Sequence, residues 1–104
     1  MADERVYMWH ALWFVPDGGE ARYAEYLKLA KPMVEAVGGK KLRSVKPERA
    51  IIGDFDADLM FFVEYPNWDA YKKFFSAPEH HKIAYIREEA TAKMLLIKCR
   101  RPII

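Results

Sequence analysis

Histidines are the residues of this chain best suited to proton transfer, because imidazole titrates nearest neutral pH. Three are present, at positions 10, 80 and 81. His80 stands two residues after Pro78, where a helix is expected to begin, and we predict it as a general base for enolisation or cyclisation. The alternative is an ordinary helix-start residue that faces solvent or bonds to a nearby backbone group. His81 should point about 100° away around the helix and face solvent.

His10 is the second candidate catalytic residue. It shares an apolar strand face with Met8, Leu12 and Phe14, where a lone histidine is usually a core residue with a satisfied hydrogen bond. If His10 and His80 faced one cavity, a base on the sheet and a base on a helix could flank a substrate.

Metal and cofactor chemistry has little support in the sequence. The two histidines lack an evident third ligand, and the chain has one cysteine, Cys99, so no metal site is expected. There is no phosphate-binding loop, dinucleotide-binding glycine pattern or nucleophile elbow, and we expect no cofactor.

Aromatic side chains could line a ligand pocket around these histidines, although most aromatics at strand and helix spacing simply build the core. Tyr23 and Tyr26 can place a hydroxyl group in a pocket from a helix. Glu64, the only charged residue of its strand, could pair with Arg43 or Arg87. The predicted ligand-binding residues are Trp9, Tyr23, Tyr26, Arg43, Tyr65, Trp68 and Tyr85.

The elements that must position these side chains follow from hydrophobic periodicity, since a spacing of two predicts strands and a spacing of three or four predicts helices. Asn67 is a preferred N-cap, and Ser76 and Glu79 have the spacing of a capping box. Gly38 and Gly39 are expected to end the first helix. The predicted order is strand 6–15, helix 20–37, a hairpin or broken strand over 40–46 and 49–53, strand 59–65, two helical pieces between 67 and 90, and strand 91–101.

This order is β-α-β-β-α-β, which predicts an α+β, ferredoxin-like fold: an antiparallel sheet with the helices on one face. Its length suits one domain over residues 1–104, with a core from about residue 6 to residue 99. Both faces of strands 6–15 and 59–65 are apolar, so a monomer would expose a large apolar patch. The simplest arrangement that covers the patch is a twofold homodimer with its two sheets face to face.

Composition argues against several classes of protein. Of the 104 residues, 52% are hydrophobic, which is too apolar for a disordered chain. The net charge of +2 is too balanced to indicate binding to nucleic acid or to an anionic membrane. No apolar run approaches the ~20 residues of a membrane-spanning helix. The start, residues 1–5, lacks the pattern of a secretory signal. Together with the single cysteine, these features predict a cytoplasmic protein.

Several short motifs resemble one known family. They are Arg22-Tyr23-Ala24-Glu25-Tyr26, Ala30-Lys31-Pro32, Val37-Gly38-Gly39, Val63-Glu64-Tyr65-Pro66, Ser76-Ala77-Pro78-Glu79-His80 and Ala92-Lys93-Met94-Leu95-Leu96-Ile97. On these motifs the chain is similar to the dimeric α/β-barrel superfamily and, more closely, resembles the domain of unknown function 1330. The resemblance implies that the ferredoxin-like domain pairs into a dimeric α/β barrel. His80 stands where this family usually has an aromatic residue, and Lys46-Pro47-Glu48 replaces a glycine-rich stretch.

The superfamily includes cofactor-independent monooxygenases, muconolactone isomerases, polyketide cyclases, haem enzymes and proteins without a known activity. In several of its cyclases a histidine stands two residues after the proline of the second helix, which is the place of His80 here. Haem is not expected, because this short form of the fold leaves little room for a haem pocket.

Three functions stay open. The first is a homodimer that binds a small apolar or aromatic molecule between sheet and helices. The second is a cofactor-independent cyclase, isomerase or monooxygenase, with His80 as general base and His10 or a tyrosine orienting the substrate. The third is a structural dimer without a ligand.

Overall fold

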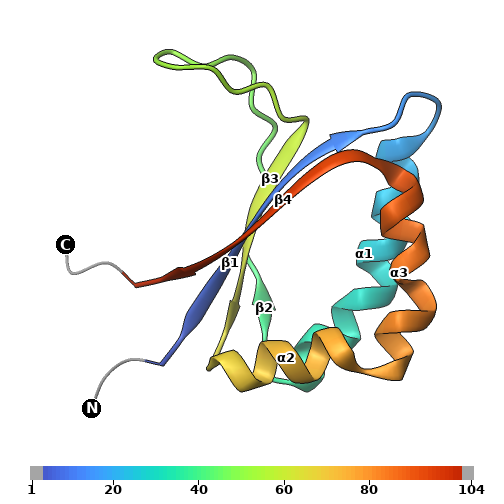
Figure 1. The fold of residues 1–104 in the computed structure, drawn as a ribbon, viewed down its shortest axis with the longest axis vertical. Coiled ribbons are helices and arrows are strands. Elements are labelled where there is room, and N and C mark those ends of the chain that lie inside the picture. Colours follow the sequence, from blue (N-terminus) through green and yellow to red (C-terminus); the bar gives the residue numbers. More distant parts are fainter. Residues whose placement is uncertain (1–3, 102–104) are drawn as a thin grey trace.

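Four antiparallel strands form one sheet, and three helices lie on one of its faces (Figure 1). The computed structural model describes residues 4–101; residues 1–3 and 102–104, and with them part of the polar start considered above, lie outside that range. The elements are β1 Val6–Phe14, α1 Gly19–Ala36, β2 Lys40–Lys41, β3 Leu59–Tyr65, α2 Trp68–Ser76, α3 Pro78–Ala90 and β4 Thr91–Arg100.

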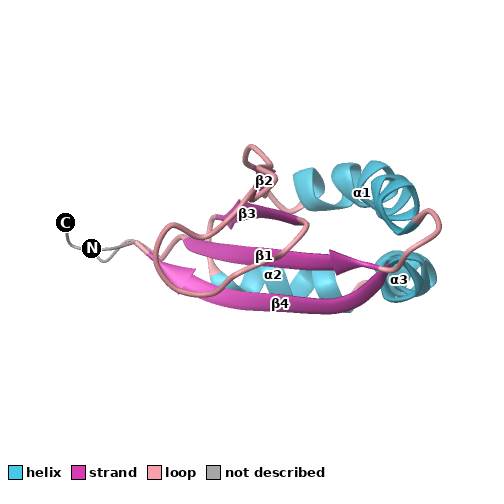
Figure 2. Cartoon of the chain, turned by 90° about the horizontal axis from the view of Figure 1, so that it is seen from above, coloured by secondary structure: helices cyan, strands magenta, loops and turns pink. Residues whose placement is uncertain are grey.

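The strand order in the sheet is β2-β3-β1-β4, so β1 lies between β3 and β4. The register pairs His10 with Phe61 on one side and with Leu96 on the other. Both views show α1 and α3 side by side against the sheet, with α2 near one end (Figure 1 and Figure 2). This confirms the predicted α+β, ferredoxin-like fold. Among residues 4–101, no helix combines the length and apolar character needed to cross a membrane.

The predicted strands at 40–46 and 49–53 are wrong over most of their length. β2 ends at Lys41. After it, within residues 4–101, the Leu42 N–H donates to the Phe62 carbonyl, and Val45 forms an isolated bridge with Met60 through hydrogen bonds of 2.9 and 3.0 Å. Pro47 has no N–H with which to extend the ladder. Residues 42–58, which we call the arm, are bound to the sheet at both ends, and the middle of this segment projects from the body of the molecule (Figure 1).

The helix boundaries follow local chemistry, with one correction. Asn67 caps α2, since its side-chain oxygen accepts a 2.8 Å hydrogen bond from the Ala70 N–H. The predicted capping box at Ser76 is wrong: the Ser76 hydroxyl donates to the Lys72 carbonyl at 2.7 Å, and Ala77 is the N-cap of α3. The cause is Pro78, which favours an extended conformation in the residue before it and therefore delays the helix start.

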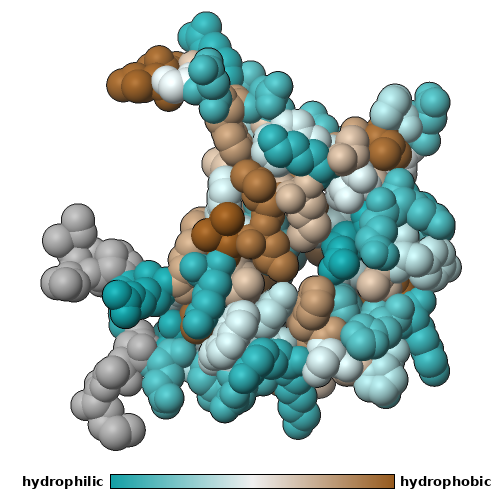
Figure 3. All heavy atoms as spheres, in the orientation of Figure 1, coloured by the Kyte–Doolittle hydropathy of each residue, from teal (hydrophilic) through white to brown (hydrophobic). Residues whose placement is uncertain are grey.

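Both faces of the sheet are largely apolar, but helices cover only one of them. The inner face, toward the helices, carries the buried core residues Val6, Met8, Leu12, Phe61, Val63 and Tyr65. Because successive side chains alternate, the opposite face, which we call the outer face, carries Tyr7, Trp9, Ala11, Trp13, Met60, Phe62, Leu95, Ile97 and Cys99, with Glu64 beside Tyr7 and Lys93 beside Trp13. No helix covers this face, and hydrophobic side chains gather on that side of the molecule (Figure 3). Phe62 and Ile97 are 39% and 44% exposed there.

Candidate functional site

A small, partly enclosed cavity lies between the inner face of the sheet and the helices. Its volume is about 40 Å³, room for about three water molecules at ~10–15 Å³ each. Leu27, Phe75, Met94 and Leu96 also line it and are only partly buried, so a larger ligand could displace them. Seven of its fifteen lining residues are phenylalanine or tyrosine: Tyr23, Tyr26, Phe61, Tyr65, Tyr71, Phe74 and Phe75.

His80 lies directly behind this aromatic wall and is only 1% exposed. The Tyr26 hydroxyl donates to its Nε2 at 2.7 Å, and its Nδ1–H donates to the Phe75 carbonyl at 3.1 Å. A carbonyl can only accept, so the second contact places the imidazole proton on Nδ1 and leaves Nε2 as the acceptor. Both nitrogens of His80 are therefore occupied, and any proton it exchanges with the cavity must pass through Tyr26.

The environment of this pair favours the uncharged forms of both side chains. Burial lowers the pKa of His80, the bond to Phe75 opposes this, and the charges of Arg87 and His81 lower it further. Burial also raises the pKa of the Tyr26 hydroxyl, an effect that the positive charge of Arg87 and its side-chain hydrogen bonding to Tyr26 oppose. At neutral pH the pair is thus a phenol bonded to a neutral imidazole, which can accept a proton.

His10 reaches the cavity from β1, opposite the helices. Its ring stacks on Phe61 with centroids 4.4 Å apart, and its Nδ1–H donates to the Met8 carbonyl at 3.1 Å. Nε2 has no protein partner within residues 4–101. Since no fully enclosed side-chain nitrogen or oxygen of the described residues lacks a partner, Nε2 must touch space that water can enter. His10 therefore offers the cavity a free hydrogen-bond acceptor.

The buried state of His10 predicts a loss of stability in acid. Burial is the main cause that lowers its pKa from 6.5 to about 4, the bond to Met8 opposes this, and the charges of Arg87 and Lys41 add to it. As the pH falls from 6.5 to 4, the unfolded chain binds this proton first, so stability falls by about 3 kcal/mol. Urea unfolding at pH 7 and pH 4 measures this effect. Between these two pH values, we expect the free energy of unfolding of His10→Gln to fall by about 3 kcal/mol less than that of wild type. Equal losses in both proteins would contradict the assignment.

The predicted site omitted Arg87, the charged residue of the cavity lining, together with several apolar lining residues such as Phe61 and Tyr71. The Arg87 guanidinium lies 5.8 Å from the ring centroid of Tyr26 and 5.6 Å from that of Phe75, and the side chain lines the cavity. No ion pair joins Arg87 to Glu64, the partner considered above, within the described residues. Arg87 follows His80 by seven residues, two helical turns, and this spacing is the sequence signal that places both on one face of α3.

The structure gathers only some of the predicted site residues. His10, Tyr23, Tyr26 and Tyr65 line the cavity, and His80 contacts it through Tyr26. The Tyr23 hydroxyl has no hydrogen bond within residues 4–101, so by the argument used for His10 it also faces water-accessible space.

The other predicted ligand-binding residues lie outside this cavity. Trp9 is on the outer face, where its ring centroid is 5.9 Å from that of Phe55 in the arm. Trp68 stacks on the far side of Tyr71, with the Lys98 ammonium 4.3 Å from its ring. Arg43 belongs to the arm, and Tyr85 is 51% exposed on the outside of α3.

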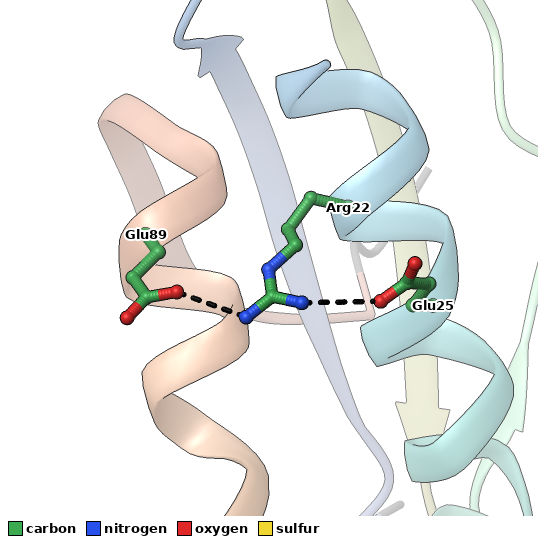
Figure 4. Close-up of polar contacts among 3 residues, drawn as sticks. All are labelled: Arg22, Glu25 and Glu89. Carbon is green, nitrogen blue, oxygen red and sulfur yellow. Dashed lines mark hydrogen bonds and ion pairs between the residues drawn. The ribbon is translucent and has the colours of Figure 1, made fainter.

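Arg22 forms ion pairs that link α1 to α3 beside the cavity. It lies between Glu25 on its own helix, at 3.3 Å, and Glu89 on α3, at 2.9 Å (Figure 4). The three charges are partly exposed to water, so the pairs add little stability. In the described part of the chain, no group of three histidine, cysteine or acidic residues could hold a metal ion.

Together, the fold and the cavity define a ferredoxin-like protein with a small aromatic-lined site between sheet and helices. The family model "domain of unknown function (DUF1330)" matches residues 18–99, and the chain belongs to this family. A comparison with curated proteins found no match.

Solved structures share the fold at low sequence identity. RPA0582, a protein of unknown function from Rhodopseudomonas palustris, is 24% identical with a TM-score of 0.86, over 97% of this chain and 85% of that one. A dimeric ferredoxin-like protein of unknown function from Jannaschia sp. CCS1 is 12% identical with a TM-score of 0.78, over 93% and 99%. The hydroxynitrile lyase of Passiflora edulis is 9% identical with a TM-score of 0.78, over 99% and 98%.

Proposed function

We propose that the protein binds a small, largely apolar or aromatic molecule in the cavity between sheet and helices. The observation that carries this proposal is the combination of an aromatic wall with three convergent polar groups: the free Nε2 of His10, the Tyr26–His80 pair and the guanidinium of Arg87. Ligand sites are typically apolar clefts with a few placed polar groups. A core built for stability alone rarely brings two neutral histidines and an arginine to one cavity.

Binding of a neutral aromatic probe tests this proposal. We expect benzamide to bind with a Kd on the order of 1 mM, the range for a fragment of its size, as its ring displaces the partly buried side chains of the wall. Ala30 lines the cavity and is 4% exposed; Ala30→Leu should fill the space and abolish binding. Ala84→Leu, at a partly buried position of α3 outside the cavity, is the matched control and should still bind. Equal binding by both variants would contradict the assignment.

A second candidate function, cofactor-independent enolisation, is favoured by the Tyr26–His80 hydrogen bond. In this step the Tyr26 oxygen takes a proton from a carbon next to a carbonyl group while its own proton moves to His80 Nε2. The electrons of the broken C–H bond form the enolate, and the Phe75 carbonyl holds the imidazolium through Nδ1–H. His10 would orient the substrate. The hydroxynitrile lyase named above is an enzyme on this fold, at an identity too low to transfer its activity.

Hydrogen–deuterium exchange at the methyl group of acetophenone measures that step without knowledge of the natural substrate. Wild-type protein should make the exchange faster than it is in buffer alone. Tyr26→Phe should lose most of this acceleration, since a positioned base contributes roughly 10²–10⁴-fold. Benzamide binding by Tyr26→Phe serves as the control for an intact cavity. Undiminished exchange in Tyr26→Phe would exclude this pair as the base.

We also propose that the protein is a homodimer paired through the outer face of the sheet. The face is mostly apolar over three strands, with Glu64 and Lys93 as its charged residues, and none of the described helices covers it (Figure 1). Ile51 and Ile52 of the arm are 82% and 94% exposed, which is unusual for side chains without a partner. A second copy with its sheet against this one would cover both surfaces. Two structural neighbours are described as dimeric, which supports the proposal. If no ligand binds, the structural dimer is the function that remains.

A further inference from the structure

Within residues 4–101, Arg87 lacks an acidic partner. The acidic residues Glu25 on α1 and Glu89 on α3 both bind Arg22, at 3.3 and 2.9 Å (Figure 4). Within residues 4–101, Arg87 takes part in none of the ion pairs. Its positive charge is therefore not neutralised by the protein around it.

The surroundings of Arg87 are suited to an anion. The guanidinium lies between the aromatic rings of Tyr26 and Phe75, at 5.8 and 5.6 Å from their centroids, and the residue is only partly buried. Stacking against rings holds the planar group, and its in-plane N–H donors can bind an acceptor. A carboxylate accepts two such donors at once, which makes this pairing both strong and specific.

Arg87 is also the permanent cation of this cavity wall. Both histidines of the site are neutral at pH 7, because burial lowers their pKa values. The Lys41 ammonium group lies 4.8 Å from the ring centroid of Phe61, a cavity residue, but it donates to the Leu42 carbonyl and, at 2.7 Å, to the Ser44 hydroxyl. An anionic ligand would therefore meet one arginine, with neutral hydrogen-bonding groups behind it.

We propose that Arg87 binds the carboxylate of the cavity's ligand, so that the ligand is a small organic acid whose apolar part packs among the aromatic side chains between sheet and helices. This inference rests on the proposed binding function and adds the chemical class of the ligand. The carboxylate would lie at the arginine and the body of the molecule against Tyr23, Phe61 and Tyr65.

Acids and their isosteric amides test the proposal, because each pair differs in charge and hardly in shape. Benzoate is compared with benzamide, and propionate with propionamide, by NMR titration of the full-length protein at pH 7. In wild type, we expect the acid of at least one pair to bind tenfold or more tightly than its amide. Added KCl should narrow this difference, because salt screens a partly exposed charge. Equal affinities for acid and amide in wild type would overturn the proposal without any variant.

Arg87→Met keeps the long apolar stem and removes the charge, so it should lower the affinity for the acid to that for the amide and abolish the preference. Arg87→Lys should restore part of the preference, since lysine supplies the charge without the two-pronged geometry. Arg49→Met is the matched control, because it removes one arginine charge from the arm and should leave the preference intact. Loss of the preference in Arg49→Met as well would point to net charge and overturn the site. If neither acids nor amides bind, the cavity proposal itself fails; if amides bind as well as acids, only the arginine site fails.

Discussion

Phe62→Lys is expected to convert the proposed homodimer into a monomer at micromolar concentration. Phe62 lies on β3 in the outer face and is 39% exposed when the chain is alone. In the twofold dimer proposed above, each interface contains this position twice, so the variant would bury two unpaired ammonium groups. Desolvating an unpaired charge is costly, and we expect association to weaken by about a hundredfold or more, or ~3 kcal/mol. Sedimentation equilibrium measures the change directly.

Tyr85→Lys is the matched control for this experiment. Tyr85 is 51% exposed, so it is at least as accessible in the single chain as Phe62, but it lies on α3 on the helical side of the molecule. A dimer that uses the outer face should tolerate this change. If Tyr85→Lys dissociates and Phe62→Lys does not, the interface lies on the helices. If wild type is itself a monomer at all concentrations, the proposed dimer is wrong.

His80→Ala is expected to destabilise the protein by about 2–4 kcal/mol at matched protein concentration. The side chain is 1% exposed and makes two hydrogen bonds, to Tyr26 and to the Phe75 carbonyl. Truncation leaves a cavity and strands the Tyr26 hydroxyl without its acceptor, which adds ~1–3 kcal/mol to the cost. Urea unfolding measures the difference in free energy.

A double-mutant cycle with Tyr26→Phe isolates the hydrogen bond between the two side chains. Tyr26→Phe alone should cost about 1–2 kcal/mol, because His80 Nε2 loses its donor. The double variant should lose less than the sum of the two single losses, with a coupling of about 0.5–3 kcal/mol. Strict additivity would mean that the 2.7 Å contact contributes nothing to stability.

A loss of stability in His80→Ala would be compatible with a functional role for His80 in the site. The imidazole is both a buried structural group and the acceptor behind Tyr26, so one substitution disturbs packing and proton transfer together. Exchange and binding measurements on Tyr26→Phe separate these roles, because this variant keeps the imidazole in place.

The fold was predictable where the local signals agreed with each other. Strand 59–65 is continuous and apolar, ends at Pro66 and is followed by the N-cap Asn67; its bounds are confirmed without change. Gly38 adopts a φ of 83° after α1, in agreement with the predicted stop. The strand predicted at residues 49–53 is wrong. It contains the apolar pair Ile51 and Ile52, but no strand of the described sheet pairs with these residues.

The site was only partly predictable, because a cavity depends on which element faces which. His10, Tyr23, Tyr26 and Tyr65 were found by their residue types and by the faces they occupy. Trp9 has the same aromatic character, yet alternation along β1 places it on the outer face. Arg87 was missed because a charged helix residue usually faces solvent, and its turn toward the cavity depends on the packing of α3 against α1.

Methyl NMR during a benzamide titration tests the central claim, that the space between sheet and helices is a binding site. Leu27, Met94 and Leu96 report on the cavity, while Met60, Leu95 and Ile97 report on the outer face. We predict saturable shifts at the three cavity residues, with the outer-face methyl groups unchanged. Shifts confined to the outer face, or no shifts in either set, would contradict the account and leave a dimer whose sheet and helices enclose only a core.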